Sequence, residues 1–226
     1  MRRLTAAVVF DCDGVLVDSE PISNATLAQV LTEIGLPTTV EQSVEAFLGR
    51  SWQHVLSVVT ERRGGREPPA DLHARYRERL FARFDAELEP VSGIAAALDL
   101  LAQEGIPTCV ASSGSHDRIR HGLSATGLLD YFDDERIFSA TDVEHGKPAP
   151  DLFLHAANRM GFDPRTTVVV EDSPAGVRAG VAAGMRVLGY AERTPADRLA
   201  DAGAIVFHDM DQLPGLLGIA AVEERS

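Results

Sequence analysis

We expect an α/β protein with a parallel sheet, and three features of the sequence lead to this prediction. Short apolar segments, several of them β-branched, recur along the chain, and amphipathic helical patterns lie between them. Strands that alternate with helices in this way form βαβ units, in which the strands run parallel. The third feature is a stretch with helical patterns alone, residues 18–88, which follows the first predicted strand.

Five segments are predicted as strands. Residues 5–10 come first, and their short, bounded and apolar character is typical of a strand that is buried on both faces. Four further segments share this length and composition. They are residues 107–111, 166–170, 186–188 and 204–207.

Helices are predicted between these strands from their apolar spacing and their end signals. Ile94, Leu98 and Leu101 lie on one helix face, and Pro174 is placed in the first turn of another helix. Three helical patterns are each followed by a glycine, which accepts the left-handed conformation common just after a helix. These glycines are Gly105, Gly161 and Gly184.

Residues 18–88 break the alternation of strands and helices. Two apolar stripes and one basic amphipathic segment indicate helices there. The stripes are Leu27, Val30, Leu31 and Ile34, then Trp52, Val55, Leu56 and Val59, and the basic segment is residues 75–84. Two arrangements fit this pattern. The helices form a domain inserted into the α/β core, with a hinge at the two crossings, or they pack on one face of the sheet.

The composition excludes several classes of protein. The chain has 226 residues, of which 45% are hydrophobic and 24% charged, as in globular rather than disordered proteins. Its formal net charge of −13 repels nucleic-acid backbones and anionic membranes. No apolar run approaches the roughly 18 residues that cross a bilayer, and two cysteines are too few for a disulfide framework. We therefore expect a cytoplasmic monomer that binds neither nucleic acid nor membranes.

Acidic residues follow two of the predicted strands. Asp11 and Asp13 come after the first strand, and Glu171 and Asp172 come after the third. Ligands of open parallel sheets bind at the carboxyl ends of the strands, so up to four carboxylates converge if these strands are neighbours. Oxygen ligands without a His or Cys cluster suit a hard cation such as Mg²⁺. A solvated acidic turn and a helix N-cap are the alternative interpretations of the two pairs.

Two further segments offer groups that bind phosphate. Ser112, Ser113 and Gly114 follow the strand at residues 107–111, and hydroxyl and backbone N–H groups at such a turn bind anions. Lys147 stands between Gly and Pro residues just before a helix, where its charge neutralises a phosphate or a carboxylate. A helix N-cap and a solvated surface lysine are the alternatives.

These four motifs occur in the order that characterises a known superfamily. Over essentially the whole chain the sequence resembles the haloacid dehalogenase (HAD) superfamily, in the subgroup with a helical cap after the first strand. Residues 11–20, 146–153 and 170–173 are similar to the signatures of its β-phosphoglucomutases and sugar phosphatases. The resemblance implies a Rossmann-like three-layer core with a parallel sheet, residues 1–17 and 89–226. It also implies a small all-helical cap domain, residues 18–88.

The resemblance implies a catalytic centre with Mg²⁺ as cofactor. Asp11 is the implied nucleophile, which forms an aspartyl-phosphate, and Asp13 is the implied general acid and base. The implied metal ligands are Asp11, the backbone carbonyl of Asp13, Asp172 and, nearby or ligating, Glu171.

The resemblance also implies where the substrate binds. Its phosphate-binding residues are Ser112, Ser113, Gly114 and Lys147. Glu20 and Arg50, both in the predicted cap, are the candidate contacts to the rest of the substrate, which we expect to be a small phosphorylated metabolite.

Departures from family patterns separate three activities. The dehalogenases lack an acid at the position of Asp13, so its presence argues against carbon–halogen cleavage. Ser23 and Trp52 stand where β-phosphoglucomutases carry a His and an Arg, and residues 18–21 and 84–88 are more similar to sugar-phosphate and 6-phosphogluconate phosphatases. We therefore expect a phosphatase for a sugar phosphate or sugar-acid phosphate, with a phosphomutase as the alternative. A phosphoprotein-binding module without turnover is a further rival.

Overall fold

The computed structural model describes residues 5–49 and 51–219. The chain divides into two compact units. The α/β unit consists of Met1–Val17 with Pro90–Ser226, and the helical unit is Asp18–Glu89. The action of these units as a core domain and a cap domain stays a prediction.

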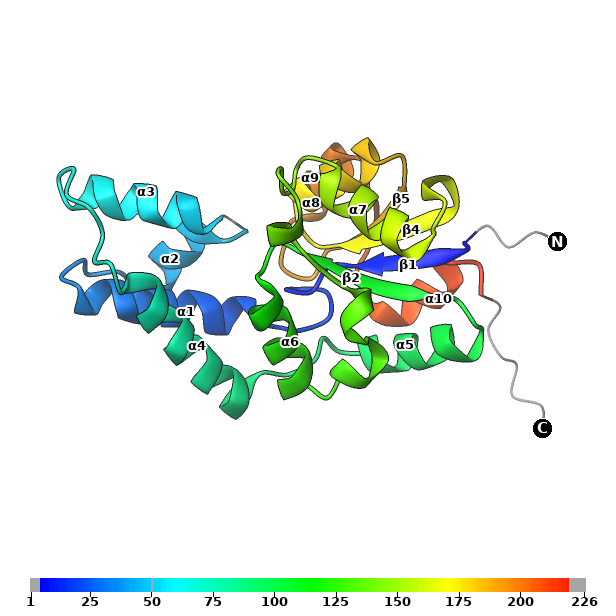
Figure 1. Cartoon of the computed structure of the whole chain (residues 1–226), viewed down its shortest axis with the longest axis horizontal. Helices are drawn as coiled ribbons and strands as arrows, with labels where there is room; N and C mark the ends of the chain where they lie inside the picture. Colours follow the sequence, from blue (N-terminus) through cyan, green and yellow to red (C-terminus); the bar gives the residue numbers. More distant parts are fainter. Residues whose placement is uncertain (1–4, 50, 220–226) are drawn as a thin grey trace. The chain divides into compact units, whose positions relative to one another are not determined.

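A parallel sheet forms the centre of the α/β unit, which confirms the predicted fold class (Figure 1). In the described part of the chain it has six strands in the order β3-β2-β1-β4-β5-β6. The strands are β1 (Ala7–Phe10), β2 (Thr108–Ser112), β3 (Ile137–Ser139), β4 (Thr167–Glu171), β5 (Arg186–Tyr190) and β6 (Ile205–Phe207). The strand order places β1 between β2 and β4, so the first strand of the chain lies at the centre of the sheet.

Five of these strands lie where the sequence predicts them, and β3 is an addition. Its three residues pair with the end of β2, with Val110 opposite Ile137 and Ser112 opposite Ser139. The strand is too short to carry an alternating or continuous apolar pattern of its own. Its position is set by pairing with β2 rather than by local sequence.

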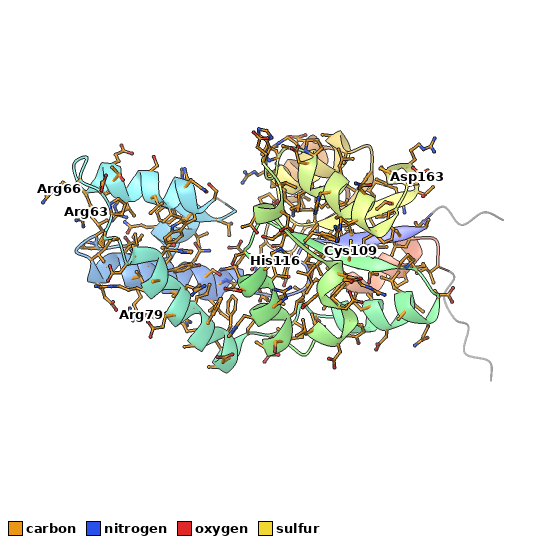
Figure 2. The ribbon with its side chains drawn as sticks, in the orientation of Figure 1. Arg63, Arg66, Arg79, Cys109, His116 and Asp163 are labelled. Atoms are coloured by element: carbon orange, nitrogen blue, oxygen red, sulfur yellow. The ribbon has the colours of Figure 1, made fainter. Side chains whose placement is uncertain are left out.

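Helices cover both faces of the sheet, as βαβ units require (Figure 1). On one face, α7, α8 and α9 pack against the side chains of the central strands in one apolar cluster. On the other face, α5 and α10 lie together. Cys109 of β2 is buried in the interior of the unit (Figure 2). The helices are α5 (Ile94–Gln103), α6 (His116–Ala125), α7 (Asp151–Met160), α8 (Pro174–Ala182), α9 (Ala196–Ala202) and α10 (Leu213–Leu216).

Four helices make up the described part of the helical unit, which has an apolar core of its own. They are α1 (Glu20–Glu33), α2 (Val40–Phe47), α3 (Trp52–Arg62) and α4 (Leu72–Glu87). The two predicted stripes meet in this core, where Leu31 and Val59 are fully buried. Trp52 packs at the edge of the core, with its ring 5.3 Å from that of Tyr76. Among the described residues, no helix has the length and hydropathy to cross a membrane.

Candidate active site

Three neighbouring strands bring the predicted site residues to one edge of the sheet. Phe10, the last residue of β1, is paired with Val110 of β2 and with Val170 of β4. Because the strands are parallel and in this register, the residues that follow meet at the same carboxyl edge. Asp11 continues the pattern, since its backbone N–H donates to the carbonyl of Val170 at 3.0 Å.

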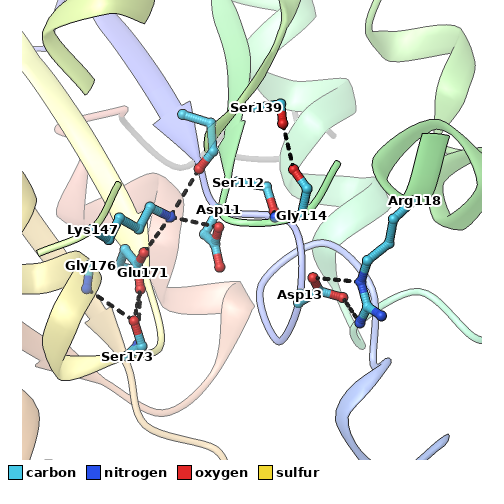
Figure 3. A network of polar contacts seen from close by, with 11 residues as sticks. Asp11, Asp13, Ser112, Gly114, Arg118, Ser139, Lys147, Glu171, Ser173 and Gly176 are labelled. Atoms are coloured by element: carbon cyan, nitrogen blue, oxygen red, sulfur yellow. Dashed lines mark hydrogen bonds and ion pairs between the residues drawn. The ribbon is translucent and has the colours of Figure 1, made fainter. Parts of the chain in front are cut away.

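Lys147 joins the ends of these three strands. Its Nζ donates to Oδ1 of Asp11 at 2.7 Å, to Oε1 of Glu171 at 2.7 Å and to the carbonyl of Ala111 at 3.0 Å (Figure 3). Only 4% of its side chain is exposed, and its ammonium lies 4.9 Å from the ring centroid of Phe153. Lys147 is therefore a buried and fully bonded cation, which excludes the solvated surface lysine considered from the sequence.

Both carboxylate oxygens of Glu171 accept hydrogen bonds. Oε1 accepts from Lys147, and Oε2 accepts from the backbone N–H and the hydroxyl of Ser173, both at 2.9 Å. The hydroxyl of Ser173 in turn accepts from the N–H of Gly176 and caps α8. The helix N-cap is thus Ser173, and Glu171 is free of that role. Its fully buried carboxylate fixes Lys147 beneath Asp11 instead.

Carboxylate oxygens of Asp11, Glu171 and Asp172 lie within 4.8 Å of one another. Asp172 is packed against the turn after β1, because a Cβ on Gly14 would lie 2.2 Å from its Oδ2. Three carboxylates beside the single charge of Lys147 leave two negative charges in a small, mostly buried volume. A divalent cation would balance that charge, and oxygen donors of this kind are those that Mg²⁺ prefers.

Burial sets the ionisation of the central pair. It raises the pKa of Asp11 to about 7, and the neighbouring Glu171 adds to the rise while Lys147 opposes it. Burial alone would lower the pKa of Lys147, but the carboxylates of Asp11 and Glu171 outweigh it and the pKa is raised. Lys147 therefore stays charged at neutral pH, and its charge draws Asp11 toward the anionic form that a nucleophile needs.

Asp13 faces a different cation from Asp11. Arg118 donates from Nη2 to Oδ1 of Asp13 at 2.8 Å and from Nε to Oδ2 at 3.2 Å (Figure 3). The extended backbone of β1 ends at Phe10, and the chain turns at Gly14, which has φ 80°. Sequence reasoning missed Arg118. Its signal is its place in the first turn of the helix that follows the Ser112 loop.

The Ser112 loop is built to present its backbone. The Ser112 hydroxyl is buried and accepts from the N–H of Gly114 at 3.1 Å, while the carbonyl of Gly114 accepts from the hydroxyl of Ser139 at 2.7 Å. Ser113 between them is exposed. The N-cap of α6 is Ser115, whose hydroxyl accepts from the N–H of Arg118. The helix N-cap considered as an alternative for this serine run is therefore confirmed at Ser115, which leaves Ser112 and Ser113 outside that role.

The two candidate substrate contacts, Glu20 and Arg50, belong by their sequence positions to the helical unit. Glu20 begins α1, and its carboxylate accepts from the Asn24 amide at 3.1 Å. The Asn24 amide oxygen accepts from Ser43, so Glu20 belongs to a polar chain between α1 and α2. Arg50 lies outside the described residues.

Comparisons with known proteins show the family to which the chain belongs. The model of the haloacid dehalogenase-like hydrolase family matches residues 8–190. The chain is 32% identical over 216 residues to the 6-phosphogluconate phosphatase of Escherichia coli (strain K12), and the match covers 96% of each chain. It is 32% identical over 186 residues to the fructose-1-phosphate phosphatase YqaB of the same strain, covering 82% of this chain and 96% of that relative.

A solved structure extends the likeness to the fold. The crystal structure of a HAD family hydrolase from Deinococcus radiodurans R1, with bound phosphate and sodium, has 30% sequence identity and a TM-score of 0.78. The match covers 97% of this chain and 99% of that one.

Fold and matches together define the protein as an enzyme of the phosphatase class with a parallel-sheet α/β fold. More closely, the chain belongs to the haloacid dehalogenase-like hydrolase family. This confirms the superfamily that the motifs indicate and the expected class of enzyme. The expected monomeric state and cytoplasmic location stay predictions.

Proposed function

We propose that this protein hydrolyses a small phosphate monoester, a sugar phosphate or a sugar-acid phosphate, with Mg²⁺ as cofactor and an aspartyl-phosphate intermediate. One observation carries the proposal. Asp11 is a buried carboxylate, bonded to Lys147, and two further carboxylates lie within 4.8 Å of it. Such an arrangement shields a carboxylate from water and places it beside a cation that draws it toward the anionic form and also attracts phosphate oxygens.

Asp11 is proposed as the nucleophile. Its carboxylate oxygen attacks phosphorus, the bond to the leaving alkoxide breaks, and one slow hydrolysis becomes two faster steps. Lys147 occupies Oδ1 of Asp11, which leaves Oδ2 as the attacking atom. The same ammonium offers positive charge to the transferring phosphoryl group, where negative charge is spread over the oxygens.

Mg²⁺ is proposed to bind at Asp11 and Asp172, with the backbone carbonyl of Asp13 as a third protein ligand. Glu171 lies within reach, but both of its oxygens accept from Lys147 and Ser173, so we place it behind the ligands rather than among them. When bound, the cation supplies electrostatic shielding between an anionic nucleophile and an anionic substrate.

The loop from Ser112 to Gly114 is proposed to hold the remaining phosphate oxygens. Ser112 contributes its hydroxyl, and Ser113 and Gly114 contribute backbone N–H groups at a strand-to-helix turn. Asp13 gives its proton to the leaving oxygen in the first step and takes a proton from water in the second. These local donors explain how a chain of net charge −13 binds an anion.

The substrate class rests on the relatives. The two phosphatases described above act, by their names, on 6-phosphogluconate and fructose 1-phosphate. We propose a substrate of the same chemistry, a phosphorylated sugar or sugar acid, with Glu20 and Arg50 as candidate contacts to its hydroxyl or carboxylate groups. The phosphomutase is the alternative; it forms a different product, and Ser23 and Trp52 stand where β-phosphoglucomutases carry a His and an Arg.

The test measures phosphate release from a panel of sugar phosphates, including 6-phosphogluconate, fructose 1-phosphate and β-glucose 1-phosphate. Asp11→Asn and a metal-free sample are the controls, and both are expected to lose at least about 100-fold in kcat. Conversion of β-glucose 1-phosphate to glucose 6-phosphate without free phosphate would establish the mutase instead. A folded protein that binds Mg²⁺ and releases no phosphate from any substrate would overturn the phosphatase.

A further inference from the structure

Arg118 and Asp13 form a bidentate ion pair. Two different nitrogens of one guanidinium donate to the two oxygens of one carboxylate, at 2.8 and 3.2 Å. Both side chains are mostly covered, with 21% of Arg118 and 24% of Asp13 exposed. Two parallel charge-assisted bonds fix the orientation of a carboxylate more firmly than one.

The loop before α6 is shaped to admit the Arg118 side chain. A Cβ on Gly114 would lie 3.2 Å from Cδ of Arg118, so the stem of the arginine passes over the glycine at contact distance. Ser115 caps the helix at the N–H of Arg118 itself. The segment that offers Ser112 and Gly114 to phosphate thus also sets the direction in which Arg118 leaves the helix.

A second arginine of the same helix shows what an ordinary surface pair looks like. Arg120 donates to Asp134, and 39% of Arg120 and 77% of Asp134 are exposed. Such a pair contributes little, because solvent competes for both charges. Arg118 instead reaches from α6 to the turn after β1, across a separation of 105 residues in the sequence.

We propose that Arg118 is a positioning residue, which holds the Asp13 carboxyl group at the reacting oxygen of the substrate. The proposal rests on the proposed function, in which Asp13 transfers protons. In the first step the proton of Asp13 passes to the leaving oxygen as the P–O bond breaks and the bond from Asp11 to phosphorus forms. In the second step water attacks phosphorus, its proton passes to Asp13, and the bond to Asp11 breaks.

The position of the Asp13 carboxyl group needs support from a side chain, because the backbone around Asp13 is a turn. Asp13 follows the end of β1 and precedes Gly14, whose φ of 80° is outside the range of an extended strand. The Asp13 backbone forms an isolated β-bridge with Val17, and the two bonds from Arg118 act on the carboxyl group itself. Proton transfer requires the acid within hydrogen-bond reach of one oxygen, and small displacements lower the rate steeply.

The test compares two leaving groups in wild type, Arg118→Met and Arg118→Lys. An alkyl phosphate, the best sugar phosphate of the panel, needs a proton on its leaving oxygen. The leaving group of p-nitrophenyl phosphate is p-nitrophenolate, a stable anion that needs no proton. We expect Arg118→Met to lower kcat/KM for the sugar phosphate by roughly 10- to 100-fold and for the aryl phosphate by less than about threefold. Arg118→Lys is expected to restore part of the loss.

Two further variants make the result specific. Arg120→Met, on the same helix, is expected to leave both rates unchanged. In an Asp13→Asn background, Arg118→Met is expected to have no additional effect on the sugar phosphate, because a residue that acts through Asp13 has nothing left to position. Equal losses with both substrates, or losses that multiply with Asp13→Asn, would overturn the proposal and assign Arg118 to substrate binding or to folding.

A structural readout separates this proposal from the proposed function. If wild type hydrolyses neither substrate, the proposed function fails, and the crystal structures of wild type and Arg118→Met then decide on Arg118. We expect one orientation of the Asp13 carboxylate in wild type and a displaced or multiple orientation in the variant. The same single orientation in both would show that Arg118 does not position Asp13.

Discussion

The carboxylate of Glu171 fills the space in which residue 176 would carry a Cβ atom. An ideal Cβ on Gly176 would lie 1.6 Å from Oε1 and 1.9 Å from Cδ of Glu171. No real contact is that short, so only glycine fits here while Glu171 keeps its place. The first turn of α8 is thereby packed directly against the group that holds Lys147.

Gly176→Ala is predicted to disturb the site through this contact. The added methyl group displaces the buried Glu171 carboxylate and breaks its bond to Lys147. We expect a loss of about 2 kcal/mol or more in the free energy of unfolding, together with at least a tenfold loss of kcat. Denaturant titration and phosphate release measure the two effects. Gly215→Ala is the control, since no atom lies within 4 Å of its Cβ. Equal behaviour of the two variants would contradict the prediction.

Gly14→Ala is predicted to weaken metal binding. Its Cβ would lie 2.2 Å from Oδ2 of Asp172, a proposed ligand of Mg²⁺. Gly184→Ala is a matched control, because the backbone there has φ 77° against 80° at Gly14, and its Cβ meets no atom within 4 Å. Both variants lose about 1 kcal/mol of stability to the left-handed backbone. Only Gly14→Ala is expected to raise the Mg²⁺ concentration for half-maximal activity, and a parallel rise in Gly184→Ala would refute the contact as its cause.

Asp11→Asn is predicted to stabilise the metal-free protein, and more so at high pH. The folded pKa of Asp11 is about 7, above its ordinary value of 3.8. Between these values the folded state holds a proton that the unfolded state has lost, so wild-type stability falls as the pH rises through this window. The variant has no such group. In EDTA, its advantage in unfolding free energy is expected to grow by on the order of 2 kcal/mol from pH 5 to pH 8.

Denaturant titrations of both proteins at the two pH values measure this advantage. Titrating groups that do not interact with Asp11 are common to the pair and cancel in the difference, whereas Lys147, Glu171 and Asp13 contribute through their interaction with it. An advantage that stays constant or shrinks toward pH 8 would show that Asp11 is not held at a raised pKa.

Both cysteines are predicted to be inert toward thiol reagents in the folded protein. Burial raises the pKa of Cys12, and the adjacent carboxylates of Asp13 and Asp11 raise it further. Burial also raises the pKa of Cys109. Because the thiolate is the reactive form, we expect negligible reaction with a disulfide reagent under native conditions and two thiols per chain in denaturant. Rapid native reaction of either cysteine would contradict the burial that the structure gives them.

Much of the sheet and of the candidate site could be predicted from the sequence, because both depend on short local patterns. The segment at residues 166–170 and the acidic pair behind it needed no distant partner to be recognised, and β4 lies there. Strand β3 was missed because its three residues are defined by pairing with β2. Helix α2 was missed too, although Val40, Val44 and Phe47 have the i, i+4, i+7 spacing of a helix face. In the structure Phe47 is buried, while Val40 and Val44 are exposed.

The partners of the acidic residues were harder to predict than the residues themselves. Arg118 is one of several arginines, and its place in the first turn of α6 is the local feature that distinguishes it from Arg120. Its contact with Asp13 arises only when β1 and β2 become neighbours, which brings the turn at Asp13 beside the first turn of α6. Lys147 could be named from its motif, but its bonds to Asp11 and Glu171 depend on the order of the strands.

The central position of β1 also decides when the site can exist during protein synthesis. A ribosome makes β1 well before its neighbour β4 and Lys147, because the helical unit, β2 and β3 lie between them in the sequence. The helical unit is a continuous segment whose core residues all come from itself, so it can complete its fold while Asp11 still lacks its cation. A nascent or truncated chain that ends before β4 leaves one edge of β1 unpaired, and unpaired strand edges recruit other chains. Truncated chains that end before β4 are therefore expected to aggregate rather than to show reduced phosphatase activity.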